Sequence, residues 1–436
     1  MSGWRLLAAL LALEAALTAL DLARGGGGIA PEERHNAHAG LLLACGHWDK
    51  ILELQYRPFC GGCSVEAAMA APLYRLLGAS VGAWKAVPAL FHLLVVAAGG
   101  ALVARQDRRA LLAWGALVLG TPAFARDVAM TGWGNHAESL GLGLAAGALL
   151  LGQRRWLCWP LAGAIATFAA WFCHTATWAP VALVVAAVGL SWRYAPLVLV
   201  GIPLGLAPAW WALRAQPEAA AAARDWWTGL ELAPFAELRR WLWDDWVASG
   251  LWPGQAGWPS ALWWGGLAAL ALYGAVRSLS APDSRRFLPL ALGALLCAYL
   301  LRYDLWRDTL PLQEYDAFNL RYRVPLLGLV MACAALAPGR AVLPIAAILG
   351  GAGLILRIAA WAPAATPLGA TVYAEDGWPD RTVPTGQPPQ RLDRLMGRPA
   401  DIEAARRFLA EHADPLPECR ALHEAELQRR QGLSSP

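Results

Sequence analysis

The chain has 436 residues, of which 57% are hydrophobic and only 16% carry a charge. This composition excludes an ordinary soluble enzyme and indicates that most of the chain lies in a membrane. The net charge of +4 comes mainly from arginines in short turns, so it does not indicate a nucleic-acid partner.

Long apolar runs recur along the chain. A helix that crosses a bilayer needs roughly 17 to 25 mostly apolar residues, because lipid offers no partner to an exposed peptide group. The runs therefore predict an all-α polytopic membrane protein with about eleven transmembrane helices. In chain order, these spans are expected near residues 4–23, 84–104, 110–125, 138–152, 156–173, 177–191, 195–213, 259–276, 287–302, 324–338 and 342–362.

The connections between the spans alternate between short arginine-rich turns and longer loops rich in tryptophan, histidine and carboxylates. Under the positive-inside rule the arginine-rich turns face the cytoplasm. This orientation predicts a multi-pass protein of the cytoplasmic (inner) membrane with a cytoplasmic N-terminus and an extracytoplasmic first outer loop at about 24–83. No clear cleavage site follows the first apolar run before Gly25, so that run is expected to be a retained signal-anchor helix.

The first outer loop is predicted to carry two short amphipathic helices along the membrane surface. Apolar positions from 37 to 44 follow helical spacing, and Glu32 and Glu33 stand near the positive end of that helix. Ser64 is expected to cap a second surface helix, which Gly78 ends. One of the two glutamates is assigned as the group that accepts a proton or holds a divalent cation, and a solvated helix start is the equally weighted alternative.

Three further polar residues of this loop, His35, His38 and Glu66, are assigned to substrate binding. The two histidines lie three positions apart and can share one helix face. A structural role is the more common reading of such a pair.

Cys60 and Cys63 are the two cysteines of the chain with a suggestive spacing. In an oxidising compartment they would form a local disulfide, and the equally weighted alternative is a tight Gly-Gly turn between two small residues. A second pair with this spacing is missing from the sequence, so a zinc site is not indicated.

A second polar cluster precedes the fourth span. Asn135 is expected to cap that helix, which places His136 and Glu138 in the first turn at the membrane boundary. An ionisable residue at that depth is costly unless it is paired or functional, so Glu138 is assigned as catalytic, with His136 and Asp127 in substrate binding. The alternative is a structural pair between Glu138 and Arg126.

A third cluster lies just before the tenth span. Arg321 and Tyr322 suit a lipid-linked phosphate, because a guanidinium binds phosphate oxygens in pairs and a tyrosine ring favours the headgroup level. Arg321 stands on the outer side, against the positive-inside bias, so the ligand reading is preferred to an ordinary interfacial anchor.

This arrangement resembles the polytopic GT-C glycosyltransferases, in particular the bacterial relatives of protein O-mannosyltransferases and the aminoarabinose transferases. The resemblance covers roughly residues 1–360 and rests on short motifs. These are Glu32-Glu33, Gly46-His47-Trp48, Arg57-Pro58-Phe59, Arg75-Leu76-Leu77-Gly78, Glu138 and Arg321-Tyr322-Arg323-Val324-Pro325. Two departures stand out: Pro31 replaces an expected aspartate, and Gly-Asn-His-Ala-Glu replaces the family's form of the second loop.

The resemblance implies transfer of a sugar from a polyprenyl-phosphate donor to a lipid, glycan or protein acceptor on the outer face of the membrane. A carboxylate at Glu32 or Glu33 would then deprotonate the acceptor hydroxyl, while Arg321 stabilises the departing lipid phosphate. A divalent cation held by Glu33 or Glu138 is one further reading, and no other cofactor is implied.

Residues 1–362 are expected to form this transmembrane domain, and residues 363–436 an extracytoplasmic tail that serves as a lid or a loose extension. The competing function is a transporter or flippase of a lipid-linked saccharide. The sequence shows no internal repeat, and its ionisable residues gather in outer loops rather than at the midplane, which disfavours a transporter. A non-catalytic scaffold would not concentrate carboxylates and histidines on one face.

Overall fold

The computed structural model describes residues 3–24, 31–48, 51, 61–105, 108–150, 152, 154–215, 258–280, 286–301, 323–337, 339, 342–359 and 419. At Glu32, His35 and Asp127 it describes the backbone alone. Arg321 and Tyr322 lie outside the described residues, and so does the tail except for Cys419.

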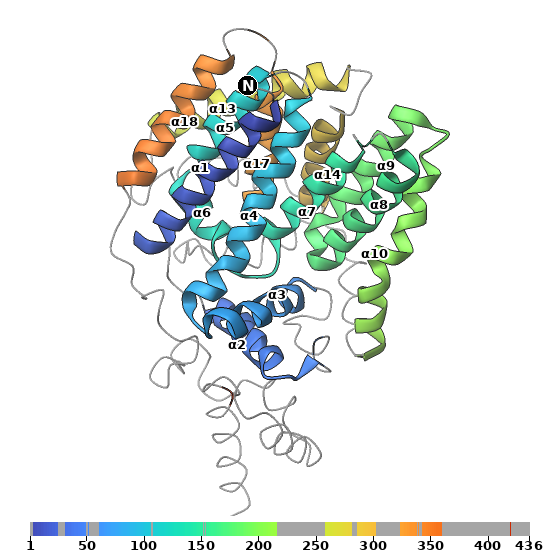
Figure 1. Cartoon of the computed structure of the whole chain (residues 1–436). Coiled ribbons are helices and arrows are strands. Elements are labelled where there is room, and N and C mark those ends of the chain that lie inside the picture. The colour runs from blue at the N-terminus through green and yellow to red at the C-terminus, as the bar shows by residue number, and fades with distance from the viewer. Residues whose placement is uncertain are drawn as a thin grey trace, which may run out of the picture.

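Each of the eleven predicted spans coincides with a helix (Figure 1). Their Leu- and Ala-rich sequences favour helix, and a membrane leaves peptide groups no other local way to be satisfied. The helices are α1 (Gly3–Arg24), α4 (Val81–Ala104), α5 (Arg108–Leu119), α7 (His136–Leu149), α8 (Arg155–Phe172), α9 (Trp178–Ser191), α10 (Pro196–Ala215), α13 (Trp258–Leu279), α14 (Phe287–Leu301), α17 (Arg323–Ala335) and α18 (Val342–Ala359).

Within the described ranges, five helical segments are long and apolar enough to cross a membrane, and no strand occurs. Four of the segments are α1, α4, α10 and α18, and the fifth joins a short 3-10 helix, η2 (His174–Thr177), to α9. Two shorter apolar helices coincide with α14 and α17. The all-α polytopic fold predicted from the sequence is therefore confirmed.

One predicted span is interrupted. The run at 110–125 forms α5 and then a separate short helix, α6 (Ala123–Ala129). Pro122 between them has no backbone N–H to continue the first helix. Gly120 lies against α18, where a Cβ atom on it would stand 2.0 Å from the Gly350 carbonyl oxygen, so only glycine allows this approach.

The loop between the first two predicted spans forms α2 (Pro31–Ala44) and α3 (Gly62–Leu77), which pack together at one end of the bundle (Figure 1). As predicted, α3 ends at Gly78, whose φ is +81° and whose N–H donates to the Tyr74 carbonyl oxygen at 2.9 Å. The predicted start is wrong, because α3 begins at Gly62 and Ser64 is buried inside its first turn.

The α2 helix is covered by other parts of the protein along most of its length. Residues 36–45 are all buried, so the helix has no solvent-facing side over this stretch. The α3 helix covers one side, where the Tyr74 hydroxyl donates to the Ala37 carbonyl oxygen at 3.2 Å. On another side the Asn36 amide donates to the Gly132 carbonyl oxygen at 3.0 Å. A helix that is apolar on most faces is stable only when neighbours cover it.

A disulfide joins Cys45, at the end of α2, to Cys419, across 374 positions of sequence. The proposed disulfide between Cys60 and Cys63 is not formed, because Cys63 keeps a buried thiol that donates to the Trp133 carbonyl oxygen at 3.8 Å. Cys60 itself lies outside the described residues. The tail is therefore tied to the first outer loop by a covalent bond that spacing alone cannot predict.

Candidate active site

Three connections that are distant in sequence meet at the end of the bundle that carries α2 and α3. The N-terminus of α3 packs against the loop before α7, where a Cβ atom on Gly62 would lie 1.8 Å from the Gly134 carbonyl oxygen. The Gly61 N–H donates to the Trp171 carbonyl oxygen at 2.9 Å, which joins the same point to the end of α8. The polar residues around this junction form the candidate site.

Glu33, in the first turn of α2, is fully buried and fully bonded. Lys85 Nζ lies 2.7 Å from Glu33 Oε1 and 2.9 Å from Oε2. Trp84 Nε1 and the Gly132 N–H each donate to Oε1 at 2.9 Å. Because a cation neutralises Glu33 and three donors occupy one oxygen, its carboxylate is held in place rather than open to a substrate proton.

Lys85 is a residue of the candidate site that the sequence reasoning missed. It is buried in the first turn of α4, and its third N–H bond goes to the Met130 carbonyl oxygen at 3.0 Å. A signal was present, because Lys85 and His92 are the two ionisable residues in an otherwise apolar run from 81 to 104. An ionisable residue in such a run marks a functional or paired position.

Glu138 stands where the sequence predicted it, in a capping box at the start of α7. The Asn135 side chain accepts from the His136 N–H at 2.6 Å, and Glu138 Oε2 accepts from the Asn135 N–H at 3.2 Å. The other oxygen, Oε1, is buried and has no hydrogen-bond partner among the described residues. The alternative pairing with Arg126 is wrong, since Arg126 bonds to Glu14 and Asp21 instead.

Glu66 faces the same junction from α3. It is fully buried, and within the described part of the chain its carboxyl oxygens have no hydrogen-bond partner other than the Glu138 carboxyl group. Burial, and then the neighbouring Glu138 carboxylate, raise the pKa of Glu66 well above its usual range. The two glutamates therefore form a buried carboxyl pair, which we call the Glu66–Glu138 pair, and their surroundings favour the protonated form of Glu66.

Two predicted histidines are buried in the helices that carry the site. His136 Nδ1 lies 2.8 Å from the Thr175 hydroxyl and 3.7 Å from the Cys173 sulfur. His38, on α2, is buried as well. Cys173 and Thr175 come from the short connection between α8 and α9, which carries no recognisable motif, so sequence reasoning did not find them.

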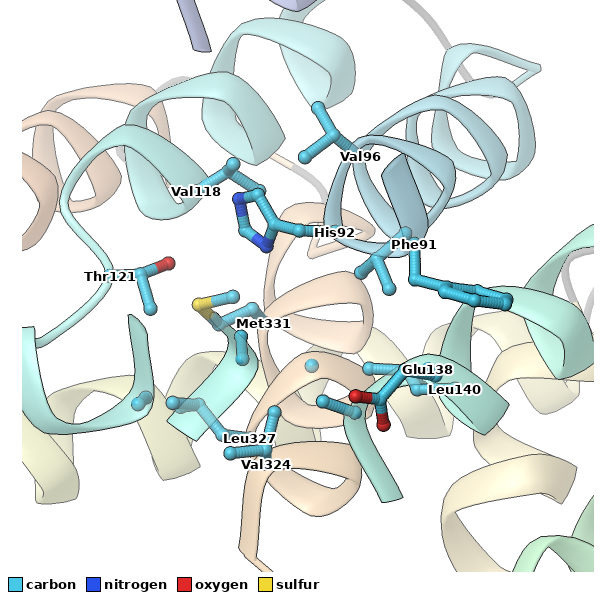
Figure 2. Close-up of a pocket in the computed structure, with 15 residues that line it drawn as sticks. Phe91, His92, Val96, Val118, Thr121, Glu138, Leu140, Val324, Leu327 and Met331 are labelled. Atoms are coloured by element: carbon cyan, nitrogen blue, oxygen red, sulfur yellow. The ribbon is translucent and has the colours of Figure 1, made fainter. Parts of the chain in front are cut away.

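A small cavity of about 40 Å³ opens beside Glu138 within the bundle (Figure 2). Its walls are mostly apolar side chains of α4, α6, α7 and α17, and His92 and Thr121 supply the other polar groups. The volume suits a few water molecules rather than a sugar. Val324, the second residue of α17, lines the wall, and the predicted Arg321 and Tyr322 lie outside the described residues.

The predicted cation site at Glu33 and Glu138 does not fit the residues around it. Glu33 is already neutralised by Lys85. Among the described residues, no group of three His, Cys, Asp or Glu side chains is arranged to hold a metal ion. The open oxygens at this junction belong to the Glu66–Glu138 pair.

No protein-family model and no curated protein matches the chain. A solved structure does match in fold: the apo crystal structure of ArnT from Cupriavidus metallidurans, with a TM-score of 0.53 and 16% sequence identity. The match covers 77% of this chain and 59% of ArnT, so the chain spans less than two thirds of the length of that protein. ArnT is an aminoarabinose transferase of the GT-C class, and the chain shares its polytopic membrane fold, as the resemblance in the sequence implied.

Proposed function

We propose that the chain is a glycosyltransferase that moves a sugar from a polyprenyl-phosphate donor to an acceptor hydroxyl at the outer face of the cytoplasmic membrane. The observation that carries this proposal is the Glu66–Glu138 pair, two buried carboxyl groups with three oxygens that have no partner outside the pair among the described residues. Unbonded buried carboxyl groups destabilise a fold, so they are expected where chemistry uses them. The fold similarity to ArnT supports the reaction class.

In this proposal Glu138 is the general base. Its open Oε1 accepts the proton of the acceptor hydroxyl as the acceptor oxygen attacks the anomeric carbon of the sugar. The bond from that carbon to the phosphate oxygen breaks, and the lipid phosphate leaves with the additional negative charge. Glu66 keeps its own proton, which avoids two adjacent buried negative charges and leaves Glu138 as the group that changes protonation.

We assign the lipid phosphate to Arg321 and Tyr322. The place of Val324 in the cavity wall beside Glu138, three positions later in the chain, supports this assignment. Glu33 becomes a positioning residue, because its bonds connect α2, α4 and Gly132. His35, His38, Asp127 and His136 remain proposed substrate contacts, and Glu32 remains a proposed catalytic carboxylate of the first loop.

The proposed orientation puts the site outside the cell and the N-terminus in the cytoplasm. Arginine-rich turns support it under the positive-inside rule. The Cys45–Cys419 disulfide also supports it, because disulfides persist in oxidising extracytoplasmic compartments. The donor lipid and the acceptor, whether lipid, glycan or protein, would then approach from the same face.

The test uses proteoliposomes that contain the purified chain and a polyprenyl-phosphate sugar with a radiolabelled sugar. A transferase breaks the sugar–phosphate bond and yields free polyprenyl phosphate together with a labelled acceptor, and Glu138→Gln abolishes both products. A flippase moves the labelled lipid between leaflets with that bond intact. Translocation without bond cleavage would overturn the proposal, and so would equal cleavage by the parent and Glu138→Gln.

A further inference from the structure

A second group of charged side chains is buried inside the helix bundle, apart from the Glu66–Glu138 pair. Glu14, Thr18 and Asp21 follow one another at helical spacing on α1, so they share one face of that helix. Arg126 of α6 and Arg357 of α18 bond to them. We call these five residues the α1 charge cluster.

The two arginines divide the bonds of the α1 charge cluster. Arg126 donates to Asp21 Oδ2 at 2.8 Å and to the Thr18 hydroxyl at 3.0 Å, and it also bonds to Glu14. Arg357 Nε donates to Asp21 Oδ2 at 2.9 Å, and its Nη1 lies 3.5 Å from Glu14 Oε2. Two carboxylates face two guanidinium groups, so the cluster is electrically balanced, which a buried group of charges requires.

Arg126 and Arg357 differ in the backbone segments that follow their helices. It belongs to α6, a helix of only 7 residues, and a helix that short depends on tertiary contacts for its stability. The backbone that follows α6 forms hydrogen bonds with residues of the candidate site. The Met130 carbonyl oxygen accepts from Lys85, and the Gly132 N–H donates to Glu33.

The same backbone continues to the rest of the site. The Trp133 carbonyl oxygen accepts from the Cys63 thiol, and the Asn135 N–H donates to Glu138. Arg357 lies near the end of α18, and the described residues that follow it to position 359 contribute nothing to these bonds. Arg357 does donate to the Leu119 carbonyl oxygen at the end of α5, at 3.2 Å, but Leu119 precedes α6 and is not part of the site backbone. A shift of α6 would therefore displace the site backbone directly, and a change at Arg357 would reach it only through the α5–α6 connection.

We infer that Arg126 is a positioning residue of the candidate site. Through the α1 charge cluster it fixes α6 against α1, and α6 in turn fixes the backbone from Met130 to Asn135 against Glu33, Lys85 and Glu138. The inference rests on the proposed function only in calling this site active, because it concerns the geometry of the site and is measurable without any substrate.

The chain offers a matched pair of variants. Arg126→Met and Arg357→Met each remove one cation from the same cluster and leave the same excess of negative charge. The reporter is Cys63, whose thiol is buried and donates to the Trp133 carbonyl oxygen. Alkylation of Cys63 by a small maleimide, in native membranes, is quantified by peptide mass spectrometry alongside the thermal midpoint of each variant.

The expected result is alkylation of Cys63 at least about tenfold faster in Arg126→Met than in the parent or Arg357→Met. Both variants should lose thermal stability. The inference is overturned if both variants label Cys63 at one rate, or if Arg126→Met protects it as well as the parent. Should Arg126→Met fail to accumulate, the charge-balanced double variant Glu14→Gln/Arg126→Met replaces it, with Glu14→Gln/Arg357→Met as its control and the same two criteria. Neither outcome bears on whether the chain transfers sugar.

Discussion

Glu33 Oε1 lies 2.7 Å from Lys85 Nζ, and both residues are almost completely inaccessible to solvent. This ion pair joins the first turn of α2 to the first turn of α4 and holds the loop at Gly132 between them. It changes the role expected for Glu33, because the carboxylate is occupied by Lys85, Trp84 and the Gly132 N–H. In the proposed transferase we therefore assign the proton-accepting role to the Glu66–Glu138 pair.

Replacement of Lys85 by methionine should destabilise the protein by about 3–5 kcal/mol, since it leaves the buried Glu33 carboxylate without its cation. Chemical unfolding in mixed micelles, followed by tryptophan fluorescence, measures the change. In the double variant Lys85→Met/Glu33→Gln the uncompensated charge is gone, so much of the stability should return. A double variant no more stable than Lys85→Met would contradict a buried ion pair.

Glu66 should make stability depend on pH. Burial raises the pKa of Glu66 in the folded state above its value of about 4.3 in an unfolded chain. The folded state thus keeps a proton that the unfolded state releases as the pH rises. The contribution of Glu66 to the free energy of unfolding is therefore most favourable at low pH. It declines as the pH rises from the pKa of the unfolded state toward the pKa of the folded state. The slope can reach about 1.4 kcal/mol per pH unit.

Glu66→Gln keeps a neutral side chain of the same shape and removes this titration. Relative to the parent, the variant should therefore gain stability steadily as the pH is raised from about 5. Unfolding midpoints of both proteins over a pH series test this. A difference that stays constant across the series would show that Glu66 does not carry a raised pKa.

Gly62 allows α3 to contact the loop before α7, and a methyl group there would meet the Gly134 carbonyl oxygen at 1.8 Å. Gly62→Ala should therefore force the two segments apart, with a loss of about 1–3 kcal/mol or more. Gly265→Ala is the matched control, because a Cβ at that position meets nothing within 4 Å. The measurement is the thermal unfolding midpoint of each variant, which should be lower for Gly62→Ala than for Gly265→Ala. Equal midpoints would rule out the close packing.

The Cys45–Cys419 disulfide should stabilise the protein by about 2–4 kcal/mol. Cys45→Ser and treatment of the parent with a reductant should lower the thermal midpoint equally, whereas Cys297→Ser should leave it unchanged. Electrophoresis without reductant should also show a faster-moving parent band than Cys45→Ser. If maleimide labels Cys45 and Cys419 in the untreated parent, the bond is not present.

Much of the fold follows from sequence alone, because membrane burial imposes length and hydropathy on each helix. The start of α7 was predicted closely, since Asn135 and Glu138 are local neighbours in a capping box. The break at Pro122 was missed because apolar residues continue on both sides of it. Hydropathy indicates whether a segment lies in apolar surroundings, but it does not show where the backbone changes direction.

The candidate site was harder to predict, because its contacts join distant segments. Glu33 and Glu138 were predicted because they are polar residues beside apolar runs. Their surroundings differ, because Lys85 forms an ion pair with Glu33 and Glu66 lies beside Glu138, and both of these partners come from other helices. The burial of α2 likewise depends on α3 and on the loop at Gly132. A single sequence does not record which segments cover one another.

The most direct measurement is the initial rate of sugar transfer from a polyprenyl-phosphate donor in proteoliposomes, for the parent and for Glu138→Gln at equal amounts of folded protein. If Glu138 takes the acceptor proton, the variant should lose about 10²- to 10⁴-fold in kcat while its KM for the donor changes little. A Glu138→Gln variant that transfers sugar as fast as the parent would contradict the proposed role of the Glu66–Glu138 pair.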